Sequence, residues 1–181
     1  MLRSEMTNAA QTPDPLLLII AGQHGDEPLG LVVAQMLRPG ARPVLGSDRF
    51  IGFHGAVNPE GLGRARRVRN DNVDPNRVWG AEAQAANQAD ILATLTEAVA
   101  AGRKILVLDC HSDHKPAHVL VAGPRGAAAA GGTARTERVE GSLAAWCEDH
   151  GIPCLVLEAQ EGQGVDATVA AGRAAIAAAF A

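Results

Sequence analysis

Continuous apolar segments alternate with helical patterns along the chain. The runs that indicate buried strands cover residues 16–21, 50–57, 105–110, 119–122 and 154–157. Helical patterns cover residues 28–37, 81–101, 137–150 and 165–180. Strands that alternate with helices predict an α/β fold, with a mostly parallel mixed sheet and helices on both faces.

Four local features refine this prediction. Pro39-Gly40 is expected to end the first helix, and Val44–Leu45 to form a short edge strand. Residues 58–80 lack a helical or strand period and predict a long ordered loop, which is usually functional in a compact domain. Residues 123–133 are rich in glycine and alanine and predict a mobile loop.

Length and composition favour one domain. Residues 1–15 are polar with two prolines and predict a loose N-terminal arm, and residues 16–181 predict a single catalytic domain. The net charge of −4 gives no general attraction for nucleic acid or for acidic membranes. The first apolar run is too short to span a bilayer, and no secretory pattern precedes it, so we expect a cytoplasmic protein. Three cysteines without a C-x-x-C pair do not indicate a disulfide framework.

Polar residues follow three of the predicted strands. His24 and Glu27 follow the first, in a glycine-flanked turn where Pro28 suits the start of a helix. Asp109-Cys110-His111-Ser112 ends the third strand, and Glu158 comes directly after the fifth. If these strands are parallel, all three ends lie at one edge of the sheet, where open α/β sheets place their ligands. By themselves, His24 and Glu27 would indicate only an ordinary polar turn between two elements.

Two histidines and a carboxylate suit a catalytic zinc ion. Such sites use three protein ligands and leave one position open for water. Zinc lowers the pKa of that water to about 7. A further carboxylate is then needed to carry the proton of the water to the leaving group, and Glu158 is the candidate. The alternative for Glu158 alone is a salt-bridged residue at a strand end.

The loop at 58–80 supplies positive charge. An arginine can hold a carboxylate through two hydrogen bonds or stabilise a developing oxyanion. We expect Arg64, Arg66 and Arg67 to be a solvated charge run. A nucleic-acid patch is the other interpretation, but no aromatic residues lie between these arginines to stack on bases.

Five motifs together resemble the zinc metallocarboxypeptidase superfamily, and most of all its succinylglutamate desuccinylase/aspartoacylase branch. In order, they are Gly-Gln-His-Gly-Asp-Glu at 22–27, Asn-Pro-x-Gly at 58–61, Arg69 with Asp-Pro-Asn-Arg at 74–77, Leu-Asp-Cys-His-Ser at 108–112, and Leu-Val-Leu-Glu at 155–158. The motifs span residues 16 to about 160 in the order of that family. The resemblance implies the three-layer αβα fold of a zinc carboxypeptidase.

The resemblance also implies a role for each matching residue. His24, Glu27 and His111 would bind one zinc ion per chain. Glu158 would act as general base and then general acid, and Arg69 would polarise the scissile carbonyl. Asn76 and Arg77 would hold a substrate carboxylate, and Asp74 would orient His24.

The sequence departs from the family pattern in three places. Pro75 stands where the family usually has a leucine-like residue, and the chain has no tyrosine to present to a substrate. The desuccinylases and aspartoacylases carry an extra C-terminal β-rich domain, whereas we expect the residues around Glu158 to belong to a minimal catalytic domain. A neighbouring subunit of a homo-oligomer, or the 123–133 segment, could therefore cover the site.

These observations predict a zinc-dependent hydrolase. Its substrate would be an N-acyl amino acid or a short peptide with a free carboxylate, cleaved at an amide bond by metal-activated water. A metallocarboxypeptidase or a murein-peptide amidase is the alternative within the same chemistry. A zinc-binding protein without catalysis is a further alternative, and neither nucleic acid nor a membrane is an expected partner.

Overall fold

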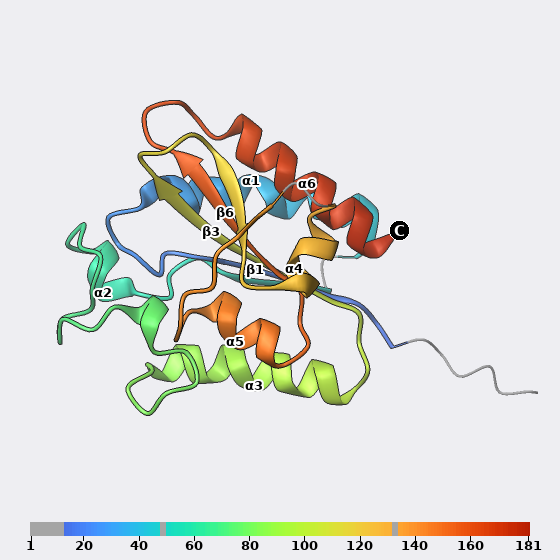
Figure 1. Cartoon of the computed structure of the whole chain (residues 1–181), viewed down its shortest axis with the longest axis horizontal. Helices are drawn as coiled ribbons and strands as arrows, with labels where there is room; N and C mark the ends of the chain where they lie inside the picture. The colour runs from blue at the N-terminus through green and yellow to red at the C-terminus, as the bar shows by residue number, and fades with distance from the viewer. Residues whose placement is uncertain (1–12, 48–49, 132–133) are drawn as a thin grey trace, which may run out of the picture.

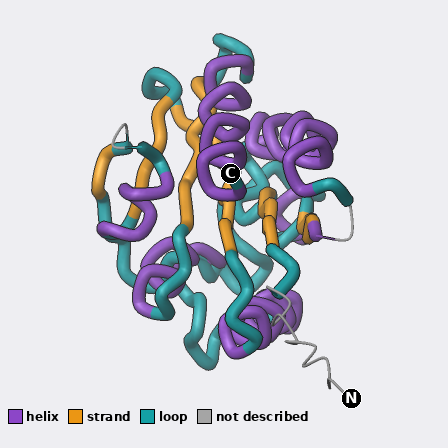
Figure 2. The backbone as a smooth tube through the Cα atoms, turned by 90° about the vertical axis from the view of Figure 1, so that its right-hand side faces the viewer, coloured by secondary structure: helices purple, strands orange, loops and turns teal. Residues whose placement is uncertain are grey.

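The structure, a computed structural model, describes residues 13–47, 50–131 and 134–181. Six strands form one sheet in the order β2-β1-β3-β6-β4-β5 (Figures 1 and 2). They are β1 (Leu16–Ala21), β2 (Ile51–His54), β3 (Ile105–Asp113), β4 (His118–Val121), β5 (Arg135–Thr136) and β6 (Cys154–Gln160). Neighbouring strands are parallel except for β4 and β6, which are antiparallel. This confirms the predicted α/β fold with a mostly parallel mixed sheet.

Helices cover both faces of the sheet. They are α1 (Pro28–Leu45), α2 (Pro59–Leu62), the 3₁₀ helix η2 (Pro75–Arg77), α3 (Ala86–Ala100), α4 (Pro124–Ala129), α5 (Leu143–Asp149) and α6 (Asp166–Phe180). Figure 1 shows α1 and α6 on one face, and α3 and α5 on the other. No helix within the described residues combines the length and the apolar character needed to cross a bilayer.

The first strand is buried on both faces, which explains its continuous apolar sequence. All six residues of β1 are buried. Successive side chains of a strand point to opposite faces. Leu17 and Ile19 pack into the core with α1 and α6, whereas Leu18 and Ile20 pack into the core with α3. A central parallel strand of this kind needs apolar residues at every position.

Strands β1, β3 and β6 are adjacent and parallel, so their carboxyl ends meet at one edge of the sheet. The register pairs Ala21 with Cys110, and His111 with Glu158. Helix α1 starts at this edge and packs closely on β3 at Gly30, where a Cβ atom would lie 2.4 Å from the carbonyl oxygen of Cys110. Glycine is therefore required at position 30 for α1 to reach the strand that carries His111.

The predicted end of the first helix is wrong. Helix α1 continues through Pro39 and Pro43 and ends only at Gly46, which has a positive φ. The predicted edge strand at Val44–Leu45 is part of this helix. Ala41 and Leu45 are buried and extend the apolar face of the helix onto the sheet. This packing outweighs the local preference of proline and glycine to end a helix.

Other predicted boundaries also change. Residues 58–80 contain α2 and η2 rather than only loop, and residues 124–129 of the predicted mobile loop form α4. Residues 132–133 of that loop, and residues 1–12 of the predicted arm, lie outside the described residues. Helix α5 begins at Leu143 instead of Glu137, after the N-cap Ser142. The residues before it include β5, a short strand that the pattern did not indicate.

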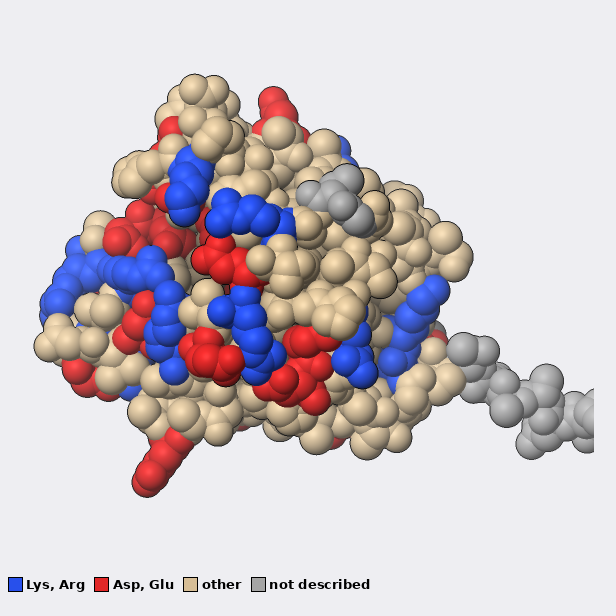
Figure 3. Space-filling model, viewed as in Figure 1, with Lys and Arg blue, Asp and Glu red and all other residues tan. Residues whose placement is uncertain are grey.

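Positive and negative side chains are interspersed on the face drawn in Figure 3. Ion pairs among the described residues include Arg138 with Asp149 and Arg125 with Glu148. This face therefore offers no continuous basic surface of the kind that attracts a phosphate backbone.

Candidate metal centre

The turn between β1 and α1 carries two of the predicted metal ligands. Glu27 occupies the N-cap position of α1, and Pro28 follows as the first helical residue. The turn lies tightly against α2, since a Cβ atom on Gly25 would lie only 2.0 Å from the carbonyl carbon of Gly61. This contact holds the turn, and with it His24 and Glu27, at the edge of the sheet.

His24, Glu27 and His111 form one cluster. The Nδ1 atom of His24 lies 2.7 Å from one carboxylate oxygen of Glu27, and the Nδ1 atom of His111 lies 2.7 Å from the other. One ligand atom from each of the three residues lies within 4.8 Å of the others. Both histidines are 3% exposed, so the cluster is held inside the protein. The tertiary structure therefore brings together the three residues predicted from two separate motifs.

The other ring nitrogen of each histidine faces a second carboxylate. Nε2 of His24 lies 2.9 Å from Oδ1 of Asp74, and Nε2 of His111 lies 3.1 Å from Oδ1 of Asp109. A carboxylate at Nε2 favours the tautomer with its proton there and leaves Nδ1 as a lone-pair donor. Both Nδ1 atoms point toward Glu27: without a metal ion they can donate hydrogen bonds to its carboxylate, and in the Nε2–H tautomer they would offer lone pairs to a bound ion.

Asp109 belongs to a buried network that the sequence reading missed. Gln23 donates a hydrogen bond from Nε2 to Oδ2 of Asp109 over 2.6 Å, and the indole of Trp79 donates to Oε1 of Gln23 over 2.7 Å. Asp109 and Gln23 are fully buried. The signal that could have revealed Asp109 is its position two residues before His111 on a strand, which places both side chains on the same face.

The electrostatics of the cluster favour a cation. Burial raises the pKa of Glu27, but the hydrogen bonds with His111 and His24 outweigh it and hold the pKa well below its usual range. Burial lowers the pKa of His111, but Asp109 and Glu27 outweigh it and raise the pKa well above its usual range. The carboxylates around the two histidines therefore stabilise positive charge at this place, as protons on the rings or as a metal ion.

The donor set fits zinc. Two imidazole nitrogens and one carboxylate are among the ligand combinations of catalytic zinc sites, which keep a position open. Each histidine also has the carboxylate partner that typically orients a metal-binding imidazole. His24, Glu27 and His111 are accordingly the residues that would hold the ion.

Glu158 faces the same space from β6, the strand next to His111. Within the described part of the chain, its carboxylate makes no hydrogen bond or ion pair, and only its main-chain oxygen accepts one, from Thr168. Burial raises the pKa of Glu158 above its ordinary value; nearby His111 opposes this shift, and Glu27 adds to it. A carboxylate that is uncommitted and easily protonated suits proton transfer.

Arg67 and Arg69 occupy different places. Arg69 lies outside the pocket: its guanidinium holds Asp71 through two hydrogen bonds of 3.2 and 2.6 Å and donates to the carbonyl of Ala83. Arg67, which we expected to be solvated, is 43% exposed and also lines the pocket. It donates to Glu27 over 3.0 Å and to Asp74 over 3.1 Å. Arg67 is therefore the arginine of this pair that the structure brings to the candidate metal ligands His24, Glu27 and His111.

Asn76 and Arg77 line the pocket from η2. Oδ1 of Asn76 accepts a hydrogen bond of 3.1 Å from the backbone N–H of Leu143, which leaves its amide N–H groups available. Arg77 donates to the main-chain oxygen of Asn76 and, among the residues described, has no carboxylate partner. An unpaired guanidinium beside a free amide is suited to bind an anion.

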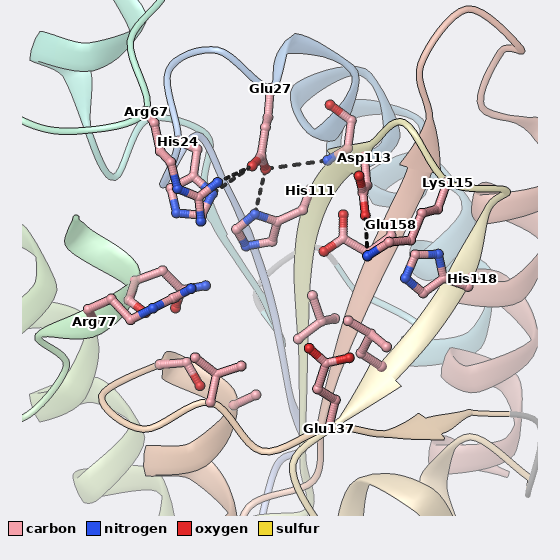
Figure 4. Close-up of a pocket in the computed structure, with 17 residues that line it drawn as sticks. His24, Glu27, Arg67, Arg77, His111, Asp113, Lys115, His118, Glu137 and Glu158 are labelled. Carbon is pink, nitrogen blue, oxygen red and sulfur yellow. Dashed lines mark hydrogen bonds and ion pairs between the residues drawn. The ribbon is translucent and has the colours of Figure 1, made fainter.

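These residues surround one pocket of about 260 Å³. Figure 4 shows His24, Glu27 and Arg67 on one side, Glu158 and Lys115 on another, and Arg77 across the space from Glu158. Lys115 pairs with Asp113 at 3.2 Å. The pocket thus brings together the three candidate metal ligands, the uncommitted carboxylate of Glu158 and the unpaired guanidinium of Arg77.

Comparison of this fold with solved structures finds hydrolases, among them a metallo-carboxypeptidase. The chain superimposes on a metallo-carboxypeptidase from Burkholderia cenocepacia with a TM-score of 0.61 and 18% identity, over 93% of this chain and 57% of that chain. It has a metallocarboxypeptidase-like fold. It also superimposes on the murein-tripeptide amidase of Escherichia coli O157, with a TM-score of 0.51 and 21% identity over 93% of this chain and 82% of that one.

A third structure belongs to the branch that the motifs resemble. The succinylglutamate desuccinylase/aspartoacylase of Rhodobacter sphaeroides has a TM-score of 0.57 and 19% identity, over 93% of this chain and 55% of that chain. This chain therefore spans little more than half the length of that protein and of the carboxypeptidase. No protein-family model matches the sequence, and no curated protein matches it either. At these identities the likeness establishes the fold, and the chemistry must be argued from the pocket.

Proposed function

We propose that this chain is a zinc-dependent hydrolase that cleaves an amide bond in an N-acyl amino acid or a short peptide with a free carboxylate. The observation that carries the proposal is the pocket itself. A cluster of metal-ligand type, an uncommitted carboxylate at Glu158 and an unpaired guanidinium at Arg77 face the same volume. Each of the three groups has a separate task in such a hydrolysis.

A zinc ion held by His24, Glu27 and His111 would supply Lewis acidity and make water acidic enough to ionise near neutral pH. Glu158 takes the proton from the attacking water and later delivers it to the leaving nitrogen. Burial raises the pKa of Glu158, which strengthens this carboxylate as a base and moves it toward the neutral range where one group can both accept and donate a proton.

Arg67 is placed to stabilise the oxyanion that develops when the carbonyl is attacked. Its guanidinium already contacts Glu27, so it lies beside the proposed metal position. A cation aimed at a developing negative charge typically accounts for a factor of about 10² to 10³ in rate. Arg69 is the alternative that the family resemblance suggests.

Asn76 and Arg77 would hold the carboxylate of the substrate. The side chain of Asn76 is fixed by Leu143, so its free amide N–H groups keep their direction. Asp74 would orient two groups of the site at once. Its Oδ1 lies beside Nε2 of His24, and its Oδ2 accepts a hydrogen bond from Arg67.

Two reactions remain within this chemistry. Removal of an acyl group from an amino acid and removal of a C-terminal residue from a peptide both require a carboxylate anchor beside the metal. A carboxypeptidase or murein-peptide amidase is the alternative, and the residues of β4 and of the segment after β5 that line the pocket would then contact the peptide. A screen of N-acyl amino acids against short peptides, with zinc present, separates the two.

Glu158→Gln is the decisive variant for the mechanism. We expect the amide replacement to keep the zinc content of the protein and to lower kcat by a factor of at least about 10² to 10⁴, the usual contribution of general acid–base catalysis. Metal analysis and steady-state kinetics on the best substrate of the screen measure both quantities. A variant with normal kcat would remove Glu158 from the mechanism.

A further inference from the structure

The pocket contains a carboxylate that the proposed reaction does not use. Glu137 directly follows β5, and its side chain points into the pocket from the wall opposite the metal cluster (Figure 4). Its only ion pair within the described ranges is with Arg135, at 2.9 Å, and the two side chains are 45% and 64% exposed. An exposed pair of this kind is weak, so a ligand can compete for the carboxylate.

The backbone holds Glu137 in a defined position relative to the proposed anion site. Its N–H donates to the carbonyl of Val121 over 2.8 Å, which extends the pairing of β5 with β4. Four residues later, the carbonyl of Gly141 accepts a hydrogen bond from Trp79. A Cβ atom on Gly141 would lie 2.1 Å from the carbonyl oxygen of Arg77. The segment that carries Glu137 therefore packs directly against the backbone of the anion-binding residue.

Part of the pocket wall is apolar. It is formed by the side chains of Leu120, Val139, Ala144 and Val156. A substrate bound through its carboxylate at Arg77 would lay its side chain along this wall and place the end of that side chain near Glu137. A substrate side chain with an aliphatic stem and a positively charged end would contact the apolar lining through its stem and the carboxylate of Glu137 through its charge. An acidic side chain would meet the negative charges of Glu137 and Glu158.

We infer that Glu137 is a specificity-determining residue that selects substrates whose carboxylate-bearing residue has a basic aliphatic side chain, of the lysine or ornithine type. The inference rests on the proposed function, because the orientation of the substrate follows from the metal cluster and Arg77. It adds the chemical class of the residue that the pocket accepts.

The test compares matched substrates that differ only in this side chain. We expect kcat/KM for Nα-acetyl-lysine and for the dipeptide Ala-Lys to exceed the values for the leucine compounds about tenfold, with the glutamate compounds lower still. In Glu137→Gln, the ratio of kcat/KM between lysine and leucine compounds should fall about tenfold. Glu140→Gln is the matched control, because Glu140 pairs with Arg138 outside the pocket lining. That variant should keep the ratio.

Calorimetric binding of free lysine, leucine and glutamate supplies a readout that does not depend on turnover. Tighter binding of lysine than of glutamate, with the difference lost in Glu137→Gln, supports the inference even if none of the amides is cleaved. Failure of all amide substrates would count against the proposed function alone. Equal binding of lysine and glutamate by the native protein, or a lysine preference that survives Glu137→Gln, would overturn the role of Glu137.

Discussion

Two halves of the pocket are built in different ways. The sheet half consists of residues at or just beyond the ends of β1, β3 and β6, namely His24, Glu27, His111 and Glu158. The loop half consists of Arg67, Asn76 and Arg77 from the segment between β2 and α3. In the sheet half, the register of hydrogen-bonded strands sets the distances between functional groups. In the loop half, those distances depend on side-chain contacts within the segment.

The difference appears most clearly at the arginines. Arg67 and Arg69 are two residues apart, yet one contacts Glu27 in the pocket and the other binds Asp71 outside it. The partner carboxylates decide this, because each guanidinium forms two hydrogen bonds to carboxylates. No comparable choice exists in the sheet half, where the pairing of His111 with Glu158 follows from the parallel register. A site can therefore be rigid on one side and dependent on local ion pairs on the other.

The largest expected effect comes from breaking the sheet half. Replacing His111 or His24 by alanine should lower bound zinc well below one ion per chain and reduce amide hydrolysis to background, because each removes one of only three ligands. Chelation of the native protein should give the same loss of zinc and activity. Added zinc should restore activity to the chelated native protein but not to the alanine variants. Metal analysis after dialysis and an activity assay measure both effects.

His114→Ala is the matched control for the ligand variants. His114 is 88% exposed, pairs with Glu161 and takes no part in the cluster, so its loss should leave zinc content and rate unchanged. Full zinc retention in both His24→Ala and His111→Ala would refute the ligand assignment.

The next effect tests the loop half directly. Arg67→Ala should lower kcat by a factor of about 10² to 10³, since it removes the guanidinium that contacts Glu27 beside the proposed metal position. Arg69→Ala should change kcat less than tenfold, because Arg69 contacts Asp71 and Ala83 rather than the pocket. Steady-state kinetics of both variants on one substrate make the comparison.

A larger loss of kcat in Arg69→Ala than in Arg67→Ala would mean that the segment between β2 and α3 rearranges when the substrate binds. Arg69 would then enter the site, as the family resemblance implies, and the ion pair with Asp71 would be broken in the bound state. Asp71→Asn is a useful companion, because it weakens that ion pair without touching the pocket.

The smallest expected effect concerns the substrate anchor. Arg77→Ala should raise KM for carboxylate substrates about 10- to 100-fold and leave kcat nearly constant, since a hydrogen bond to a charged group contributes about 1.5–3 kcal/mol. Substrates with an amidated C-terminus should show a much smaller change in KM. An equal rise in KM for carboxylate and amidated substrates would contradict the anchor role.

The sheet half of the pocket was predictable from local sequence patterns to a greater extent than the loop half. The strand at 16–21 and the polar residues after three strands were predicted because apolar runs and their ends are visible in the sequence, and the sheet brings those ends together as expected. Asp109 was missed as a partner of His111, although its position two residues earlier on the same strand carried the signal. The path of α1 past Pro39 was not predictable locally, because the burial of Ala41 and Leu45 decides it.

The sequence by itself determined the strands of the sheet except β5, the polar residues at the ends of three of those strands, and the chemical types that surround the pocket. These depend on hydrophobic period and residue type, which each short segment carries on its own. Only the tertiary structure decided that Arg67 faces His24, Glu27 and His111, that Asp109 and Gln23 support His111, and that Glu137 enters the pocket from the wall opposite the three candidate metal ligands. Those contacts join residues distant in sequence or choose between near neighbours, so they depend on the ion pairs and packing that exist only once the chain has folded.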